Sequence, residues 1–146
     1  MAGGYGEEQG TGRAVAAALA ANHAARPLRS PIKLSRGGLT PARLRRVLDR
    51  IEAGLPSPLP LASLAAEAGM SPFHFAREFQ RAVGVPPHQY LIRRRLDRAV
   101  LLLARRNMPL ADVARAAGFA HVSHLARQMR RLTGLSPARF RTDVLP

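Results

Sequence analysis

The sequence predicts an all-α fold in which two helix–turn–helix subdomains are joined by a long linker helix, with about seven helices in total. Apolar residues recur at helical spacing from residue 39 onward, and no segment alternates as a strand would. Proline, glycine and hydroxyl residues stand where these helices should begin and end. The pattern of Leu61–Gly84 also returns in Leu110–Gly134, which indicates a duplicated supersecondary unit.

Residues 1–38 are expected to form a flexible N-terminal segment. Residues 1–12 are rich in glycine, Arg13–Arg26 is an alanine-rich stretch that predicts a short helix, and Pro27–Gly38 has the prolines and glycines of a linker. Residues 39–142 are predicted to form the folded domain.

The helices of this domain are predicted in order from their end signals. Thr40-Pro41 starts the first helix, because a hydroxyl cap followed by proline is typical of a helix N-terminus, and Gly54 ends it. The remaining predicted helices are 61–68 and 71–83 (the first helix–turn–helix, 61–83), 87–106 (the linker helix), 110–117 and 121–133 (the second helix–turn–helix, 110–133), and a short helix from 137 to 141.

Each predicted turn has a small residue four positions before a glycine: Ala65 before Gly69, and Ala114 before Gly118. The alanine lets two helices cross closely, and the glycine accepts the positive φ that ends the first helix. Ser71-Pro72 then starts a new helix, whereas the second unit has only Ala120 or His121 there, and both are poor caps.

The charge balance indicates a polyanionic partner. The net charge is +14, from 23 Lys and Arg against 9 Asp and Glu. Nucleic acid is the first candidate and an anionic membrane surface the second, while an arginine-rich solvated surface is the plain alternative. The absence of cysteine excludes disulfides and thiol chemistry and fits a cytoplasmic protein. No segment predicts a membrane span or a secretory signal.

The second helix of each unit is predicted to carry an outward stripe suited to the DNA major groove. Helical spacing places Phe75, Phe79, Ala82 and Val83, and likewise Leu125, Met129 and Leu132, on the inward faces. The outward stripes are Phe73, Ala76, Arg77 and Gln80 in the first unit, and Ser123, Ala126, Arg127 and Arg130 in the second. An arginine can bind guanine through two hydrogen bonds, and a small alanine beside it allows close approach.

The linker helix supports a two-groove arrangement. Residues 87–106 would measure about 30 Å as a helix, and successive major-groove faces lie about 34 Å apart. Phosphate contacts are expected from helix N-termini and further arginines, namely Ser71, Arg81, Arg130, Arg131 and Arg141. The triplet Arg93–Arg95 is expected to combine packing, ion pairs with Asp97 or Glu78, and a weak attraction to phosphate.

Residues Gly37–Arg141 resemble the C-terminal DNA-binding domain of the AraC/XylS family of bacterial transcription regulators. The most specific matches are Leu110–Phe119, the run from Gly134 through Pro137 to Phe140-Arg141, and the spacer pattern of Arg95, Leu96, Ala99, Leu102 and Leu103. Leu125 and Met129 replace the usual phenylalanines, His121 stands at a position where Asp or Asn is common, and Pro86 stands where Ser or Thr usually precedes the proline.

This resemblance implies a homeodomain-like, seven-helix fold that binds about 20 bp of double-stranded DNA and contacts RNA polymerase. It places base-reading residues at Phe73, Ala76 and Arg77, and at Val122, Ser123, His124 and Arg127. Most members carry a larger N-terminal effector domain, and Arg13–Gly38 resembles its last helix and linker.

An enzyme is not expected, because the chain has no nucleophile elbow, metalloprotease motif or phosphate-binding glycine loop. His121 and His124 lack a third ligand at suitable spacing, so no metal or other cofactor is expected, and no effector pocket is indicated. The alternative left open is a nucleoid-type or interaction protein of low sequence preference, which the ratio of specific to nonspecific affinity would distinguish.

Overall fold

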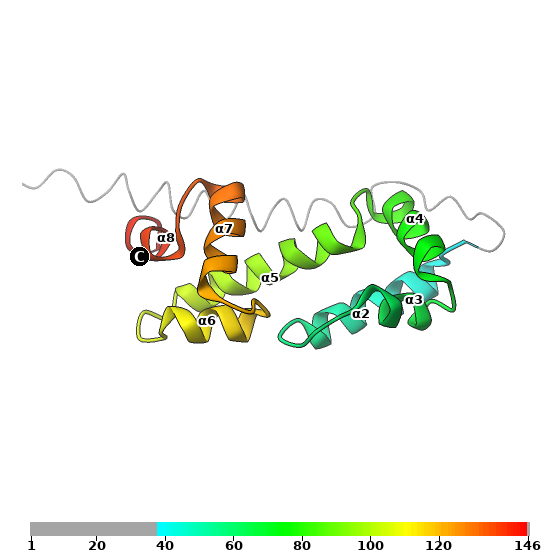
Figure 1. The fold of residues 1–146 in the computed structure, drawn as a ribbon, viewed down its shortest axis with the longest axis horizontal. Coiled ribbons are helices and arrows are strands. Elements are labelled where there is room, and N and C mark those ends of the chain that lie inside the picture. Colours follow the sequence, from blue (N-terminus) through cyan, green and yellow to red (C-terminus); the bar gives the residue numbers. More distant parts are fainter. Residues whose placement is uncertain (1–37, 146) are drawn as a thin grey trace, which may run out of the picture. The chain divides into compact units, whose positions relative to one another are not determined.

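The computed structural model describes residues 38–145, and within these residues the fold is entirely α-helical, as predicted (Figure 1). The helices are α2 (Pro41–Gly54), α3 (Leu61–Glu67), α4 (Pro72–Val83), α5 (Pro87–Leu103), α6 (Leu110–Ala117), α7 (Val122–Thr133) and α8 (Pro137–Asp143). The alanine-rich helix predicted over Arg13–Arg26 and most of the linker after it lie outside the described residues.

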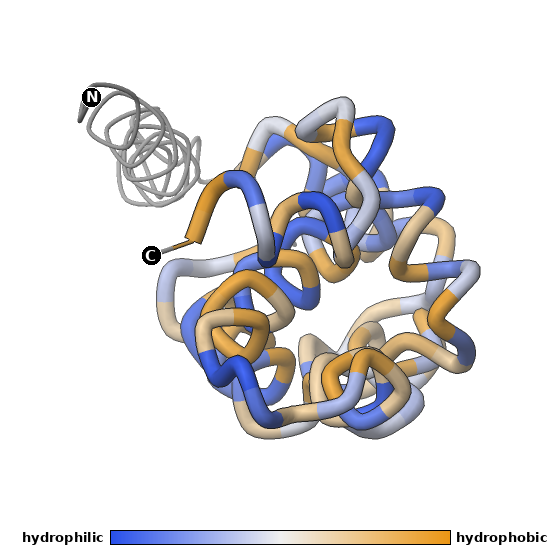
Figure 2. Tube along the Cα trace, turned by 90° about the vertical axis from the view of Figure 1, so that its left-hand side faces the viewer, coloured by the Kyte–Doolittle hydropathy of each residue, from blue (hydrophilic) through white to orange (hydrophobic). Residues whose placement is uncertain are grey.

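The described residues divide into two compact units, 38–94 and 95–145. The first unit contains α2, α3, α4 and the start of α5, and the second contains the rest of α5 with α6, α7 and α8. Each unit therefore holds one of the two helix–turn–helix pairs. Hydrophobic and hydrophilic residues alternate along the helical turns in Figure 2, as expected for amphipathic helices.

Three helices begin as the hydroxyl–proline pairs predict. The hydroxyl oxygens of Thr40, Ser71 and Ser136 accept hydrogen bonds from the backbone amides three residues later, at 3.2, 3.3 and 3.3 Å. Each satisfies an amide that the first helical turn would otherwise leave without a partner.

The core of the first unit fixes the inward face of α4. Phe75 and Phe79 are fully buried, with ring centroids 5.6 Å apart. The ring of Tyr90, from α5, meets Phe79 edge-on at 5.6 Å. Full burial of such a side chain contributes about 1.5–3 kcal/mol, so α4 is held in one rotation about its axis and its opposite face is left to solvent.

The second unit buries the corresponding residues of its own helices. Its buried hydrophobic side chains are Leu96, Ala99, Val100 and Leu103 of α5, Val113, Ala114 and Ala117 of α6, Phe119 of the turn, Leu125 and Met129 of α7, Phe140 of α8, and Val144 after it. Leu125 and Met129 stand where phenylalanines are common in the family that the sequence resembles, and both are fully buried.

The linker helix is shorter than predicted. The expected range was 87–106, but α5 ends at Leu103. The carbonyl oxygen of Leu103 accepts a hydrogen bond from Nε of Arg141 at 3.0 Å, and the amide of Arg105 turns back to the carbonyl of Leu102. A contact from a side chain 38 residues away thus accompanies the end of the helix, and helical spacing alone carries no signal for it.

The prediction that Leu132 points inward was wrong. Leu132 is 44% exposed, whereas Leu125 and Met129 on the same face of α7 are buried. Leu132 lies in the last turn, just before Gly134 ends the helix with a φ of +78°. The helical period gives the correct face, but it does not say where the neighbouring helices stop covering that face.

Candidate nucleic-acid interface

The turn between the paired helices has the same geometry in both units. Gly69 and Gly118 have φ values of +67° and +98°, in the positive-φ region that residues other than glycine rarely adopt. In each turn the amide after the glycine donates to the carbonyl of the predicted small residue: Met70 to Ala65 at 2.9 Å, and Phe119 to Ala114 at 2.8 Å. The repeat seen in the sequence is therefore a repeat in hydrogen bonding.

The outward face of α4 carries three of the four predicted stripe residues in exposed positions. Phe73 is 75% exposed, and Arg77 and Gln80 are also exposed. Ala76 differs, because it is half-buried and lines a hollow in the first unit. The stripe is thus one exposed ring, one guanidinium and one amide around a small residue that is partly covered.

Phe73 and Arg77 form one local assembly. The Cζ atom of Arg77 lies 5.6 Å from the centroid of the Phe73 ring, within the range of a cation–π contact. The two residues are four apart on a helix, where side chains are neighbours. The sequence predicted both positions but not their contact, although an aromatic residue four before an arginine is a readable signal for it.

Glu78, a buried carboxylate on α4, was not singled out as a feature of this helix. Its side chain is 8% exposed, and its Oε1 lies 3.2 Å from Nη1 of Arg81 and 3.9 Å from Nε2 of His74. Arg81, one of the predicted phosphate contacts, therefore shares its charge with Glu78. Arg77 has no carboxylate partner among the residues described, so it holds the more available positive charge on this helix.

The outward face of α7 is more basic. Ser123, Arg127, Arg130 and Arg131 are all exposed, and Ala126 is half-buried. The sequence of α7 has no acidic residue. Within the described part of the chain, none of these three arginines pairs with a carboxylate. Helix α7 therefore carries more exposed arginines without a carboxylate partner than α4 does.

Two residues that the family resemblance placed at this face are half-buried, namely Val122 and His124. The imidazole of His124 meets the ring of Phe119 edge-on, with centroids 5.3 Å apart. His121 precedes the helix as N-cap without a side-chain hydrogen bond, as its poor capping chemistry predicts. His124 thus joins the turn to the first turn of α7.

A protein-family model described as "Helix-turn-helix domain" matches residues 64–143, more than half of the chain. A curated AraC-like relative and two solved structures of the AraC type match 59%, 69% and 72% of this chain. The chain belongs to the AraC/XylS family. Among its curated relatives is the "Probable transcriptional regulator LumQ" of Photobacterium leiognathi, 39% identical over 100 residues, which are 67% of this chain and 40% of the relative. The "HTH-type transcriptional activator AarP" of Providencia stuartii is 30% identical over 98 residues, 67% of this chain and 73% of that protein.

Solved structures agree with this assignment. The DNA-binding domain of AdpA, "the global transcriptional factor, in complex with a target DNA", matches with a TM-score of 0.64 and 33% identity, over 68% of this chain and 89% of that one. A probable AraC family transcriptional regulator from Rhodopseudomonas palustris matches with a TM-score of 0.62 and 30% identity, over 72% and 99%. The chain spans 40% or less of the length of LumQ, PocR and GbdR, the first of the curated relatives it matches.

In this AraC/XylS-family chain, the arginine triplet of α5 has a partner that sequence spacing did not indicate. Arg94 binds Glu52 of α2 through two contacts, Nε to Oε1 at 2.5 Å and Nη2 to Oε2 at 3.1 Å. Glu52 was not among the expected partners, which were Asp97 or Glu78. Burial lowers the pKa of Arg95 from its ordinary value, but a guanidinium remains charged at neutral pH.

Arg141, predicted to contact phosphate, is engaged inside the second unit of the family fold. Its Nε donates to the Leu103 carbonyl at 3.0 Å, and its Nη2 lies 3.4 Å from the carbonyl oxygen of Arg105. These bonds join α8 to the end of α5 and leave Arg141 half-buried.

No helix in the described range is long and apolar enough to cross a bilayer. Residues 38–145 contain no group of three or more His, Cys, Asp or Glu side chains placed to hold a metal ion.

Proposed function

We propose that this chain is the DNA-reading part of a transcription regulator and that α4 and α7 enter successive major grooves of one duplex. The observation that carries the proposal is the matched pair Arg77 and Arg127. Both are exposed on the second helix of a helix–turn–helix, at equivalent repeat positions, and neither has a carboxylate partner among the residues described. The structure of the AdpA domain with its target DNA supports the proposal.

The side chains of α4 suit direct base reading. Arg77 would donate two hydrogen bonds to a guanine, and Gln80 could pair with an adenine. Phe73 offers an apolar surface to a thymine methyl group and also holds the guanidinium of Arg77. Ala76 would contribute space rather than a contact, because its small side chain, which lines the hollow beside α3 and α5, adds little bulk to the face near the bases.

The side chains of α7 divide between base and backbone. Arg127 would read a guanine, with Ser123 as a second polar contact and with Val122 and His124 packing at the start of the helix. Arg130 and Arg131 would bind phosphate, since both are exposed and lie in the last turn. Ser71 would add a phosphate contact at the start of α4. Arg81 and Arg141 are weaker candidates, because Glu78 and two carbonyls already engage them.

The wider function follows the family. We propose a site of about 20 bp, a cytoplasmic regulator that contacts RNA polymerase, and no catalytic activity. The two helix–turn–helix pairs are connected by a helix, since α5 belongs to both units. A helical connection restricts the relative rotation of the two reading helices more than a flexible loop would.

The decisive experiment is selection of bound duplexes from a random pool, followed by measurement of specific and nonspecific affinity at one salt concentration. A regulator of this type should bind its selected site about 10³-fold or more tightly than random DNA. A ratio near one would instead indicate a nucleoid-type protein of low sequence preference.

The two-groove arrangement has its own test. One alanine inserted between Arg94 and Arg95 falls at the boundary of the two units and leaves the internal contacts of each in place. It should rotate the second reading helix by about 100° relative to the first, and affinity for the selected site should fall to near the nonspecific level. Arg98→Ala, an exposed substitution in the same helix, is the control. Unchanged affinity after the insertion would contradict a fixed register.

A further inference from the structure

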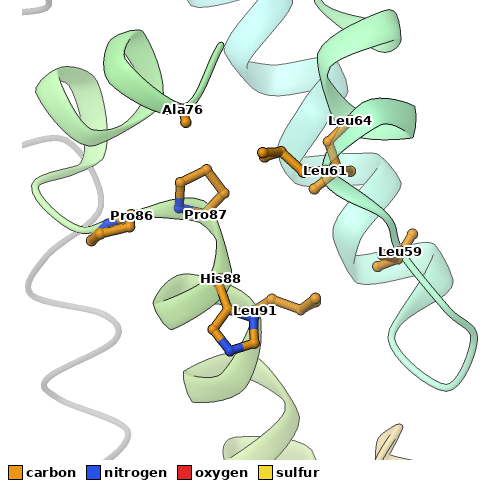
Figure 3. A pocket seen from close by; sticks show the side chains of 8 residues that line it. All are labelled: Leu59, Leu61, Leu64, Ala76, Pro86, Pro87, His88 and Leu91. Carbon is orange, nitrogen blue, oxygen red and sulfur yellow. The ribbon is translucent and has the colours of Figure 1, made fainter. Parts of the chain in front are cut away.

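The first unit contains a hollow that base reading does not explain. It has a volume of about 240 Å³ and lies between α3, α4 and the start of α5 (Figure 3). Its lining residues are Leu59, Leu61, Leu64, Ala76, Pro86, Pro87, His88 and Leu91. All of them belong to the same compact unit. Nothing in the sequence pattern indicated a pocket here.

The chemistry of the lining is nearly uniform. Four leucines, two prolines and an alanine surround the space, and His88 supplies the only polar side chain. No acidic or arginine side chain faces it, although the chain as a whole is rich in arginine. A hollow that is mostly apolar with one polar group is typical of a small-molecule site. The lining disfavours a charged ligand, because no counter-charge is present to offset desolvation.

The volume of the hollow and its opening to solvent further restrict the kind of ligand that it can bind. An apolar cavity of about 150 Å³ is enough to hold benzene, so a space of about 240 Å³ suits one ring with substituents or two fused rings. Leu61 is 40% exposed and His88 is exposed, so the hollow is open to solvent on their side. In Figure 3, Leu61 extends toward Pro87 and Ala76 across the space.

We propose that this hollow binds a small, neutral aromatic molecule that hydrogen-bonds to His88, and that its occupancy changes DNA reading by α4. The second part depends on the proposed function. Ala76 connects the two sites, because it lines the hollow and lies on α4 directly before Arg77 and three residues after Phe73. A ligand against the Ala76 methyl group contacts the same helical turn that presents the Phe73–Arg77 assembly.

The site itself is tested with indole as probe and without DNA. In a methyl NMR titration of the full chain, shifts should concentrate on the four lining leucines and Ala76 and should saturate with a Kd of about 1 mM or lower. Leu61→Trp places a large side chain at the opening and should weaken indole binding at least about tenfold. Leu101→Trp is the matched control, because Leu101 is 74% exposed and lies in the second unit, so its Kd should equal that of the parent chain.

The role of His88 is tested with a second probe. His88→Ala should weaken indole, which can donate a hydrogen bond, by about two- to tenfold. Toluene cannot donate a hydrogen bond, so its Kd for His88→Ala should stay within about twofold of its Kd for the parent chain. Absence of saturable shifts, shifts spread equally over both units, or no effect of Leu61→Trp would each overturn the ligand site. Equal losses for both probes would overturn the hydrogen bond to His88.

The link to DNA is tested by the affinity of the parent chain for its selected duplex with and without saturating indole. The affinity should change by about threefold or more, in line with ordinary coupling between sites, and the change should be lost in Leu61→Trp. If indole binds but affinity for DNA stays constant, the connection through Ala76 is wrong. The titration without DNA judges the pocket and the assay without indole judges DNA reading, so either can fail while the other stands.

Discussion

Nε of Arg141 donates a hydrogen bond to the carbonyl oxygen of Leu103 at 3.0 Å, and this bond joins α8 to the end of α5. A carbonyl at the end of a helix lacks a partner within the helix, so a guanidinium there satisfies an acceptor and adds favourable charge. The contact gives Arg141 a structural role in the second unit that its position in the family motif does not reveal.

Replacement of Arg141 should therefore lower stability. We expect Arg141→Ala to reduce the free energy of unfolding in urea by about 1–3 kcal/mol, the range for a hydrogen bond from a charged donor. Arg139→Ala is the matched control on the same helix, because Arg139 forms only an exposed pair with Asp143, and it should cost about 0.5 kcal/mol or less. If Arg141 instead contacts a DNA phosphate, Arg141→Ala would leave urea unfolding unchanged. It would reduce the slope of log DNA affinity against log salt concentration by about one.

Arg77 and Arg127 should contribute to specificity. Replacing either with alanine should weaken binding to the selected site by about 1–3 kcal/mol and relax base preference at one position, with a smaller loss on random DNA. Arg115→Ala is the control, because Arg115 lies on α6, which is not proposed to enter a groove, and pairs with Asp112 at 3.6 Å. Competition assays with both duplexes measure the effect, and equal losses on the two would contradict base reading.

The contact between Phe73 and Arg77 should appear as energetic coupling. Phe73 is 75% exposed, so Phe73→Ala should change the free energy of unfolding by less than about 0.5 kcal/mol. On the selected duplex, the double-mutant cycle of Phe73→Ala with Arg77→Ala should give a coupling of about 0.5–1 kcal/mol. Purely additive losses would mean that the ring does not position the guanidinium in the complex.

The start of α7 offers a gain in stability. His121 is the N-cap but makes no side-chain hydrogen bond, whereas Ser71 caps α4 at 3.3 Å. His121→Ser should raise the free energy of unfolding by about 0.5–2 kcal/mol, because a serine oxygen can accept from an amide of the first turn. His88→Ser, a change of the same type at an exposed position in the first turn of α5 but not at its N-cap, should give no comparable gain. Urea or thermal unfolding is the measurement. Equal free energies of unfolding for His121→Ser and the parent chain would show that the new serine does not cap α7.

Much of the fold could be predicted because its signals are local. The caps at Thr40, Ser71 and Ser136 and the positive φ of Gly69 and Gly118 each follow from a few neighbouring residues. Most of the inward faces of α4 and α7 follow from helical spacing. For the same reason the polar stripe residues Arg77, Gln80, Ser123, Arg127 and Arg130 are exposed as predicted, whereas Ala76 and Ala126 are half-buried.

The missed features depend on residues far apart in the chain. Arg94 meets Glu52 across 42 residues, and Arg141 meets Leu103 across 38. The exposure of Leu132 depends on where neighbouring helices end, and the hollow beside Ala76 depends on how three helices leave space between them. Neither short-range spacing nor residue type contains that information. The base-reading and phosphate assignments remain predictions.

The two interhelical turns are closed by the same short bond, Met70 to Ala65 and Phe119 to Ala114, and neither depends on a distant residue. The geometry of each turn is therefore set by residues within five positions of one another, while core contacts such as that of Phe79 with Tyr90 fix the rotation of α4. If the proposed function is right, a single residue added within one turn should displace only the helix that follows it, so that the contribution of one half of the selected site to binding is lost while that of the other half is kept.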